Sequence, residues 1–291
     1  MLIFFTHFAN HYFFLALQRT KQETLRNLLY IYWDMNPNVP LPDIGISVQW
    51  YGLMWSISII SCFYVGRWIL RNEKLKEEHL VLIIQYIFLG AIIGARLGQV
   101  FFYQWDYFSQ HPLEIFAVWN GGLSSHGGII GGIVGIYLFI RSHRQYSLLW
   151  LLDSAALVMA MPCALIRLGN LFNSELYGKA TDVPWAFVFE RIDDVPRHAV
   201  VLYEAIAYGI IFFVILFSYR HFGRVKDGVY FSFFFVAMFA VRFVIEFWKE
   251  PDGVPIIPFI SRTQFLSLPF IIVGVIAFVY FSKRNAVVDE V

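Results

Sequence analysis

The sequence predicts an all-α integral membrane protein with about seven transmembrane helices and an external loop, or head region, between the fourth and fifth spans. Three observations predict this class. Hydrophobic residues make up 58% of the 291 residues and charged residues only 15%, whereas an ordinary soluble domain carries about 25% charged residues. Apolar runs recur at the length that crosses a bilayer. Basic residues gather in alternate connections between those runs.

The apolar runs place the expected spans along the chain. A hydrocarbon core of about 30 Å requires roughly 20 helical residues, and seven runs approach that length. The third run is short and rich in glycine, so we expect it to begin within the membrane behind a turn at 121–125. The seven runs lie near 48–70, 80–104, 126–141, 148–170, 200–220, 228–248 and 263–282.

Lys and Arg set the expected orientation. They are frequent after the first, third, fifth and seventh spans, whereas the 105–125 connection contains none. The positive-inside rule therefore places the N-terminal tail outside and the C-terminus in the cytoplasm. Residues 1–28 are interpreted as an N-terminal extension of unknown role, because no basic residue precedes their apolar stretch as in a signal peptide. Residues 29–291 are interpreted as a single transmembrane domain.

Composition also argues against several classes of partner. The formal net charge is only +1, so no nucleic-acid partner is indicated. Both cysteines, Cys62 and Cys163, fall in apolar runs, which argues against a disulfide framework or a zinc site. Cys163 is interpreted as a small packing residue rather than a nucleophile.

A glycine-rich turn with one histidine opens the third span. His126 stands at the junction between the turn and the apolar run, within Gly121–Gly132. An imidazole can act as an acid or a base near neutral pH. The glycines allow the backbone to approach a ligand and to offer N–H donors. A packing role for His126 is equally compatible with this stretch taken alone.

A second polar group stands at the end of the fourth span. Arg167 and Asn170 are three residues apart and therefore share a helix face. Asn173 and Glu175 follow as the helix ends. So many hydrogen-bonding groups at a membrane boundary suggest either a polar ligand or a network that closes the helix end.

Two further arginines lie inside apolar runs, where charged residues mark functional sites by default. Arg96 either pairs with a carboxylate or reaches toward a polar cavity. Arg242 and Glu246 are four residues apart, which permits a salt bridge within one helix. The alternative for Arg242 is a role facing a ligand.

Guanidinium groups bind phosphate through a planar fork of donors. Several arginines near one leaflet therefore suggest an enzyme that acts on a phospholipid headgroup from the outer face. A transporter of organic anions would also use intramembrane arginines and a broken helix, so the residues alone leave both classes open.

Three motifs together resemble the bacterial prolipoprotein diacylglyceryl transferases. They are Gly-Gly-Leu-Ser-Ser-His-Gly-Gly around His126, Arg-Leu-Gly-Asn-Leu-Phe-Asn-Ser-Glu from Arg167, and Arg-Phe-Val-Ile-Glu from Arg242. The segments that begin at Trp50, Gly94 and Thr263 resemble the same family. The resemblance runs from about residue 29 to the C-terminus, with matching order and spacing.

The resemblance implies transfer of the diacylglyceryl group of phosphatidylglycerol onto the lipobox cysteine of a preprolipoprotein. Glycerol phosphate leaves and a thioether forms, without metal or soluble cofactor, at the bacterial inner membrane. The substrate supplies the thiol, whose thiolate is the reactive form. His126 is the expected base, or alternatively it only orients the substrate. Arg167 and Arg242 are expected to hold the phosphate and to stabilise the leaving group.

The resemblance also implies residues that bind or position the substrates. They are expected to line the headgroup pocket or to hold the arginines and the glycerol hydroxyls. These residues are Tyr51, Arg96, Gly127, Asn170, Glu175, Glu204 and Glu246.

The start of the fifth span departs from the family pattern. Members often have proline and glutamine where this chain has Ala199 and Val201. We expect these changes to alter substrate handling without abolishing the reaction, since the histidine and arginine motifs remain. The alternative is a catalytically impaired paralogue that binds lipid or lipoprotein.

Overall fold

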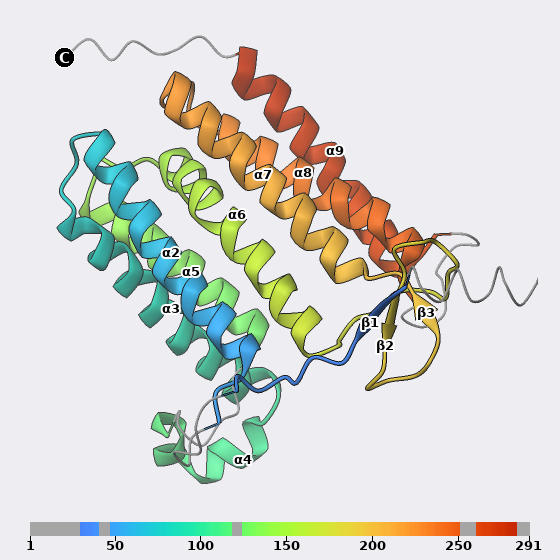
Figure 1. Ribbon diagram of the computed structural model, residues 1–291. Coiled ribbons are helices and arrows are strands. Elements are labelled where there is room, and N and C mark those ends of the chain that lie inside the picture. The colour runs from blue at the N-terminus through green and yellow to red at the C-terminus, as the bar shows by residue number, and fades with distance from the viewer. Residues whose placement is uncertain (1–29, 41–46, 118–123, 251–259, 284–291) are drawn as a thin grey trace, which may run out of the picture. The chain divides into compact units, whose positions relative to one another are not determined.

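The computed structural model describes residues 30–40, 47–117, 124–250 and 260–283. Helices dominate these ranges, which confirms the predicted all-α membrane class (Figure 1). The N-terminal extension at 1–28 and the 121–123 part of the glycine turn lie outside the described residues. The long helices are α2 (Trp50–Asn72), α3 (Glu78–Phe102), α5 (Ser125–Ser142), α6 (Leu148–Phe172), α7 (Val200–Phe222), α8 (Val229–Ile245) and α9 (Arg262–Lys283).

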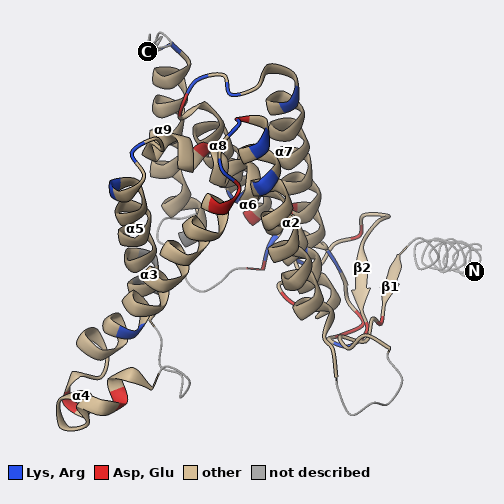
Figure 2. Ribbon diagram, turned by 90° about the vertical axis from the view of Figure 1, so that its left-hand side faces the viewer, with Lys and Arg blue, Asp and Glu red and all other residues tan. Residues whose placement is uncertain are grey.

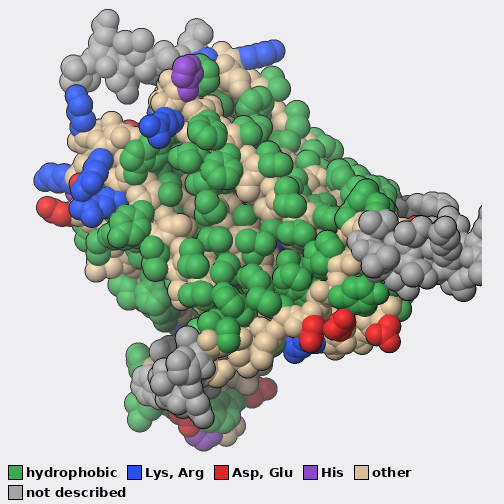
Figure 3. All heavy atoms as spheres, in the orientation of Figure 1, with side chains coloured by type: hydrophobic (Ala, Val, Ile, Leu, Met, Phe, Trp, Pro, Cys, Tyr) green, Lys and Arg blue, Asp and Glu red, His purple; other side chains and the backbone are tan. Residues whose placement is uncertain are grey.

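Six of these helices are long and apolar enough to cross a membrane. The seventh, α5, has 18 residues and occupies the place of the short third span. Figure 2 shows charged residues concentrated near helix ends and in connections, with most of each long helix free of them. Hydrophobic side chains cover most of the face in Figure 3. An apolar exterior of this kind is compatible with the hydrocarbon core of a bilayer.

The chain forms two compact units. Unit 1 comprises the described residues up to Ser58 together with Ala160–Phe213 and Val236–Val273. Unit 2 comprises Ile59–Met159, Val214–Phe235 and the described residues from Gly274 onward.

In unit 2, glycines bring the backbones of α3 and α5 into direct contact. A Cβ added at Gly94 would lie 2.3 Å from the carbonyl oxygen of Gly127. A Cβ added at Gly131 would lie 2.0 Å from that of Gly90. Small residues spaced by four allow such close approach between membrane helices. The glycines of both helices therefore permit this close packing.

A polar network in unit 2 surrounds Glu73, just after α2. Its carboxylate accepts hydrogen bonds from Trp150 Nε1 and Tyr219 Oη, both at 2.6 Å, and from Arg224 Nη2 at 2.7 Å. Burial alone raises the pKa of Glu73, but these donors lower it further than burial raises it. Glu73 thereby links the end of α2 to Trp150 on α6 and to Tyr219 on α7.

Unit 1 contains a small three-stranded sheet. Strand β1 (Ile31–Trp33) pairs in parallel with β2 (Phe187–Phe189), and β2 pairs antiparallel with β3 (Pro196–Arg197). Strand β1 precedes the first long helix, and β2 and β3 lie in the connection between α6 and α7. A strand of three residues is too short to show a clear alternation of apolar and polar side chains. Its hydrogen-bond partner also lies far along the chain.

This sheet closes an apolar core over the end of α6. Its buried members are Leu171, Phe187, Phe189, Ala199 and Val201. Val201 is completely buried, with 0% of its surface exposed. Valine therefore fits this position, because a polar side chain here would require a hydrogen-bond partner among apolar neighbours.

Candidate functional site

The end of α6 is closed by backbone hydrogen bonds that fix its last polar residues. Glu175 N donates to Asn170 O at 3.0 Å and Ser174 N donates to Leu171 O at 2.9 Å. This pair of bonds is a Schellman motif. Ser174 has a φ of 56° and Leu176 has a φ of 54°. Such left-handed conformations are strained for residues other than glycine and often accompany functional sites.

The side chains at this end form a connected chain of contacts. Arg167 Nε lies 2.6 Å from Glu204 Oε2, and both side chains are largely buried. Arg167 Nη1 donates to Asn170 Oδ1 at 3.4 Å, which confirms that these two residues share a face. Asn170 Nδ2 then donates to Glu175 Oε2 at 2.9 Å. Four of the predicted site residues are therefore brought together, and we call them the Arg167 cluster.

Tyr51 lies beside the Arg167 cluster. A Cβ added at Gly169 would lie 2.9 Å from Tyr51 Cδ2 and 3.3 Å from Tyr51 Cα. Glycine at this position therefore allows the first turn of α2 to pack against α6. Tyr51 therefore lies next to the helix turn that carries Arg167 and Asn170.

The loop after α6 ties the end of α8 to the start of α7. Gly178 N donates to His198 O and Lys179 N donates to Trp248 O, both at 2.8 Å. A Cβ at Gly178 would lie 2.6 Å from Trp248 O. Only glycine therefore fits between the backbone segments at His198 and Trp248. Through this loop, the residues that follow α8 are connected to those that precede α7.

Arg242 stands near the end of α8, with an exposed side chain. Within the described ranges it forms no ion pair or hydrogen bond, so the salt bridge that its spacing from Glu246 permits is not formed there. The chain tightens into the 3-10 helix η3 (Glu246–Trp248) at this point, which turns Glu246 away from the α-helical register. Arg242 and Lys249 both act electrostatically on the Glu204 carboxylate.

Glu246 instead joins the start of α9. Ser261 Oγ donates to Glu246 Oε1 at 2.9 Å. Ser261 also accepts from Gln264 N, while Gln264 Oε1 accepts from Ser261 N. This reciprocal pair is a capping box. It explains why serine and glutamine stand three residues apart here, and it fixes the carboxylate of Glu246.

Arg96 is buried in unit 2 and holds a connection. Its Nε donates to Ile115 O at 2.8 Å and its Nη2 donates to Ala117 O at 3.3 Å. Its guanidinium also lies 4.8 Å from the ring centroid of Phe108. These contacts fix η1 (Pro112–Phe116) and the short helix α4 (Trp105–Gln110) against α3. Arg96 therefore anchors backbone carbonyls, a role that neither sequence-based alternative included.

His126 occupies the first turn of α5, in unit 2. Ser124 caps this helix by accepting from Gly127 N at 3.3 Å, and its own N donates to Ala95 O at 2.9 Å. Gly127 faces α3 so closely that a Cβ would lie 2.3 Å from Gly94 O. Packing alone thus requires glycine at 127. Three of the predicted residues, Arg96, His126 and Gly127, belong to unit 2, whereas the Arg167 cluster belongs to unit 1.

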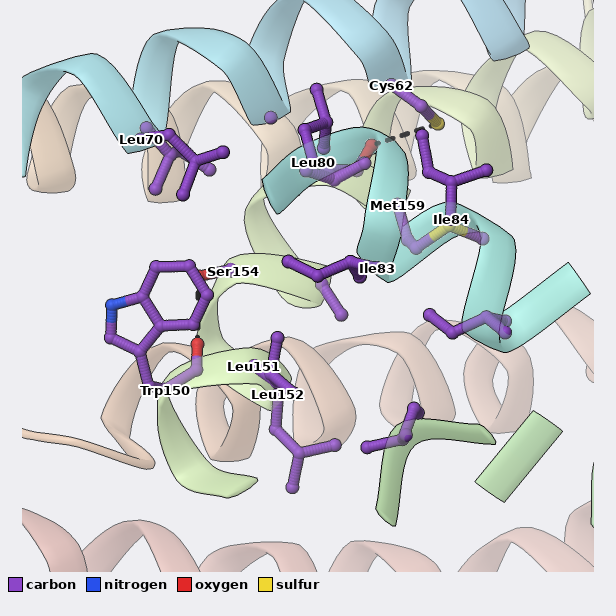
Figure 4. A pocket seen from close by; sticks show the side chains of 16 residues that line it. Cys62, Leu70, Leu80, Ile83, Ile84, Trp150, Leu151, Leu152, Ser154 and Met159 are labelled. Carbon is purple, nitrogen blue, oxygen red and sulfur yellow. Dashed lines mark hydrogen bonds between the residues drawn. The ribbon is translucent and has the colours of Figure 1, made fainter. Parts of the chain in front are cut away.

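A separate cavity of about 260 Å³ lies within unit 2 (Figure 4). Side chains from α2, α3 and α6 line it, including Leu70, Ile83 and Leu151, and Trp150 lies at its edge. Its walls are almost entirely apolar. Such a cavity suits hydrocarbon and offers no site for a phosphate.

In the part of the chain that the structure describes, no group of three or more His, Cys, Asp or Glu side chains is arranged to hold a metal ion. The Arg167 cluster itself offers guanidinium and amide donors and two carboxylates. Sequence reasoning missed Lys249 and Tyr208, which belong to the electrostatic surroundings of Glu204. A lysine at a span end and a tyrosine within a span are too common to signal a site.

The fold and these contacts define a multi-pass helical membrane protein whose helix ends carry a cluster of guanidinium and carboxylate groups. Residues 41–280 match the model of the family described as "Prolipoprotein diacylglyceryl transferase". The chain belongs to this family.

Curated relatives carry the same description at full length. The phosphatidylglycerol–prolipoprotein diacylglyceryl transferase of Chloroherpeton thalassium is 40% identical over 90% of this chain and 97% of its own length. That of Tolumonas auensis is 39% identical over 88% of this chain and 99% of its own. That of Bacteroides fragilis is 37% identical over 89% and 98%. The resemblance stated from the motifs is thereby confirmed.

Proposed function

We propose that this chain transfers the diacylglyceryl group of phosphatidylglycerol to the lipobox cysteine of prolipoproteins. Membership of the family makes it a transferase of diacylglyceryl groups. The observation that carries the proposed site is the buried contact between Arg167 and Glu204, continued through Asn170 to Glu175. This arrangement holds one guanidinium rigidly at the end of a membrane helix.

The Arg167 cluster suits the phosphate of the lipid. Glu204 takes Arg167 Nε and Asn170 takes Nη1, so the guanidinium retains further N–H donors on Nη1 and Nη2. Arg242 contributes a second guanidinium, which acts on the same Glu204 carboxylate. Two planar forks can hold a phosphodiester and then stabilise the additional charge on departing glycerol phosphate.

The chemical step is a displacement at the glyceryl carbon. The cysteine thiol of the prolipoprotein gives its proton to a base, and the thiolate sulfur forms a bond to the glyceryl carbon. The carbon–oxygen bond to the phosphate breaks, and its electron pair leaves with glycerol phosphate. His126 is proposed as the base because an imidazole titrates near neutral pH, and Tyr51 and Glu246 as residues that shape the headgroup pocket.

The proposed location is the bacterial inner membrane, with the N-terminus outside and the C-terminus in the cytoplasm. The distribution of Lys and Arg between connections supports this orientation. In this proposed orientation, the ends of α6 and α8 and the start of α7 lie at the outer leaflet, together with the Arg167 cluster.

The function is tested by complementation. Cells depleted of their own transferase should regain viability when they express this chain, and a test lipoprotein should gain a diacylglyceryl thioether by mass spectrometry. A catalytically dead relative, expressed to the same level, serves as the control. If the chain reaches the membrane and no thioether forms, the transferase proposal fails and a lipid-binding paralogue takes its place.

A further inference from the structure

Tyr208 carries a buried hydroxyl that the proposed reaction does not yet use. The side chain is 2% exposed, and its Oη has no hydrogen-bond partner within the described residues. A buried polar group without a partner is destabilising and rare in folded proteins. Among the described residues, the hydroxyl therefore contributes no hydrogen bond to the fold.

The position of Tyr208 relates it to the Arg167 cluster. It lies four residues after Glu204 on α7, which is about 6 Å farther from the helix start. Side chains on a helix lean toward its N-terminus, so Tyr208 leans toward the end that carries Glu204. The groups that act electrostatically on its hydroxyl include Glu204, Arg167 and Arg242, together with Cys163. The hydroxyl therefore lies just beneath the charged groups, on the side of the hydrocarbon.

We infer that Tyr208 donates a hydrogen bond to an ester carbonyl of the diacylglyceryl group. The inference rests on the proposed function, in which the arginines hold the phosphate. In a diacyl phospholipid, the ester carbonyls are the next hydrogen-bonding groups below the phosphate. A carbonyl accepts a phenolic hydrogen readily, whereas the ether oxygen of a dialkyl lipid is a poorer acceptor. Tyr208 is thus a residue that selects ester-linked over ether-linked lipid.

The test compares two lipids with the full-length protein in detergent micelles. Phosphatidylglycerol with ester-linked chains and its diether analogue are each offered with a lipobox peptide, and kcat and KM are measured. For the wild-type chain we expect kcat/KM to be about tenfold higher for the diester, because a site built to bind a polar group rejects the analogue without it. Tyr208→Phe should remove this preference by lowering turnover of the diester alone.

Tyr203→Phe is the matched control on the same helix. The Tyr203 hydroxyl already accepts from Trp185 Nε1 at 3.1 Å and lies 3.2 Å from His198 Nδ1. This variant should keep the wild-type ratio between the two lipids. Thermal melting of the purified variants supplies a second measurement. Tyr208→Phe should melt at or above the wild-type temperature, because the hydroxyl it removes forms no hydrogen bond with any residue that the structure describes.

The outcomes separate the inference from the proposed function. An active wild-type chain that uses both lipids equally overturns the inference and leaves the function standing. So does a Tyr208→Phe variant that keeps the diester preference, or one that melts well below the wild type. A wild-type chain that transfers neither lipid overturns the function and the inference together.

Discussion

The guanidinium of Arg167 on α6 and the carboxylate of Glu204 on α7 are paired, with Nε and Oε2 at 2.6 Å. Both side chains lie close to helix ends yet within membrane-spanning helices. Two charges in such surroundings are retained only when each compensates the other. Glu204 therefore determines the direction in which Arg167 presents its remaining donors.

Replacing Glu204 with Gln should lower kcat/KM for phosphatidylglycerol by about 10- to 100-fold, because Arg167 loses its charged partner and its fixed orientation. Thioether formation on a lipobox peptide measures the effect. Glu190→Gln, at an exposed position in the loop of the same unit, should be silent. If Glu204 acts through Arg167, Glu204→Gln should add little to Arg167→Gln in the double variant. Full additivity would contradict this.

Arg242→Lys should also lower turnover by about tenfold or more. Lysine keeps the charge but replaces a planar fork with a single ammonium, which cannot grip a phosphate through two parallel hydrogen bonds. The same peptide assay measures the loss of turnover. The control is Arg220→Lys, in the last turn of α7 and at the other end of that helix from Glu204. Near-normal turnover of Arg242→Lys would show that only the charge at this position matters.

His126→Gln should abolish most thioether formation while the protein still folds and inserts. The packing of α5 against α3 depends on Gly127 and Gly131, so the backbone of the first turn should remain in place. His111→Gln, at an exposed histidine in the connection after α4, is the control. Undiminished turnover of His126→Gln would exclude it as the base.

Adjacent glycines on α5 test the contact with α3. A Cβ at Gly131 would lie 2.0 Å from Gly90 O, whereas a Cβ at Gly132 meets nothing closer than Ile87 Cγ2 at 4.0 Å. Gly131→Ala should destabilise the protein by about 2 kcal/mol or more, through forced separation of two backbones. Gly132→Ala should be neutral or stabilising by up to about 1 kcal/mol. Thermal melting in detergent compares them, and equal effects would contradict the packing.

Acid should loosen the loop between α6 and α7. Arg197 Nη2 lies 2.6 Å from Asp193 Oδ2, and hydrogen bonds from Arg197 hold the pKa of Asp193 below its ordinary value. The pair therefore stabilises the loop fully above the ordinary pKa of aspartate, about 3.9, and this stabilisation is lost as pH falls through the lower value of the folded protein. Hydrogen exchange at Thr181 and His198 measures the loosening. Asp193→Asn should exchange faster near neutral pH and show no such acid step.

Local contacts were predictable from the sequence where their partners are near in the chain. Arg167 and Asn170 share a face because three residues make nearly one helical turn. The short third span was predictable as well, because its glycine-rich apolar run is local to residues 126–141. Partners distant in the chain were not predictable, and the pairing of Ile31 with Phe187 in a sheet is one example. Nothing near residue 31 signals which strand will supply its hydrogen bonds.

Some residues had a role that the local pattern does not reveal. Arg96 holds the carbonyls of Ile115 and Ala117, whereas the sequence suggested a carboxylate or a polar cavity. Val201, which departs from the family pattern, lies inside an apolar core. Whether that departure alters substrate handling stays a prediction.

The sequence by itself determined that this chain is a helical membrane protein, because the length and polarity of each span are local properties fixed by the bilayer. Its motifs also determined the family, through their order and spacing. Only the tertiary structure decided that Arg167 pairs with Glu204, that Glu246 binds Ser261, and that the hydroxyl of Tyr208 has no partner among the described residues. Such pairings depend on which helix faces come together, and that is settled by packing across the whole unit.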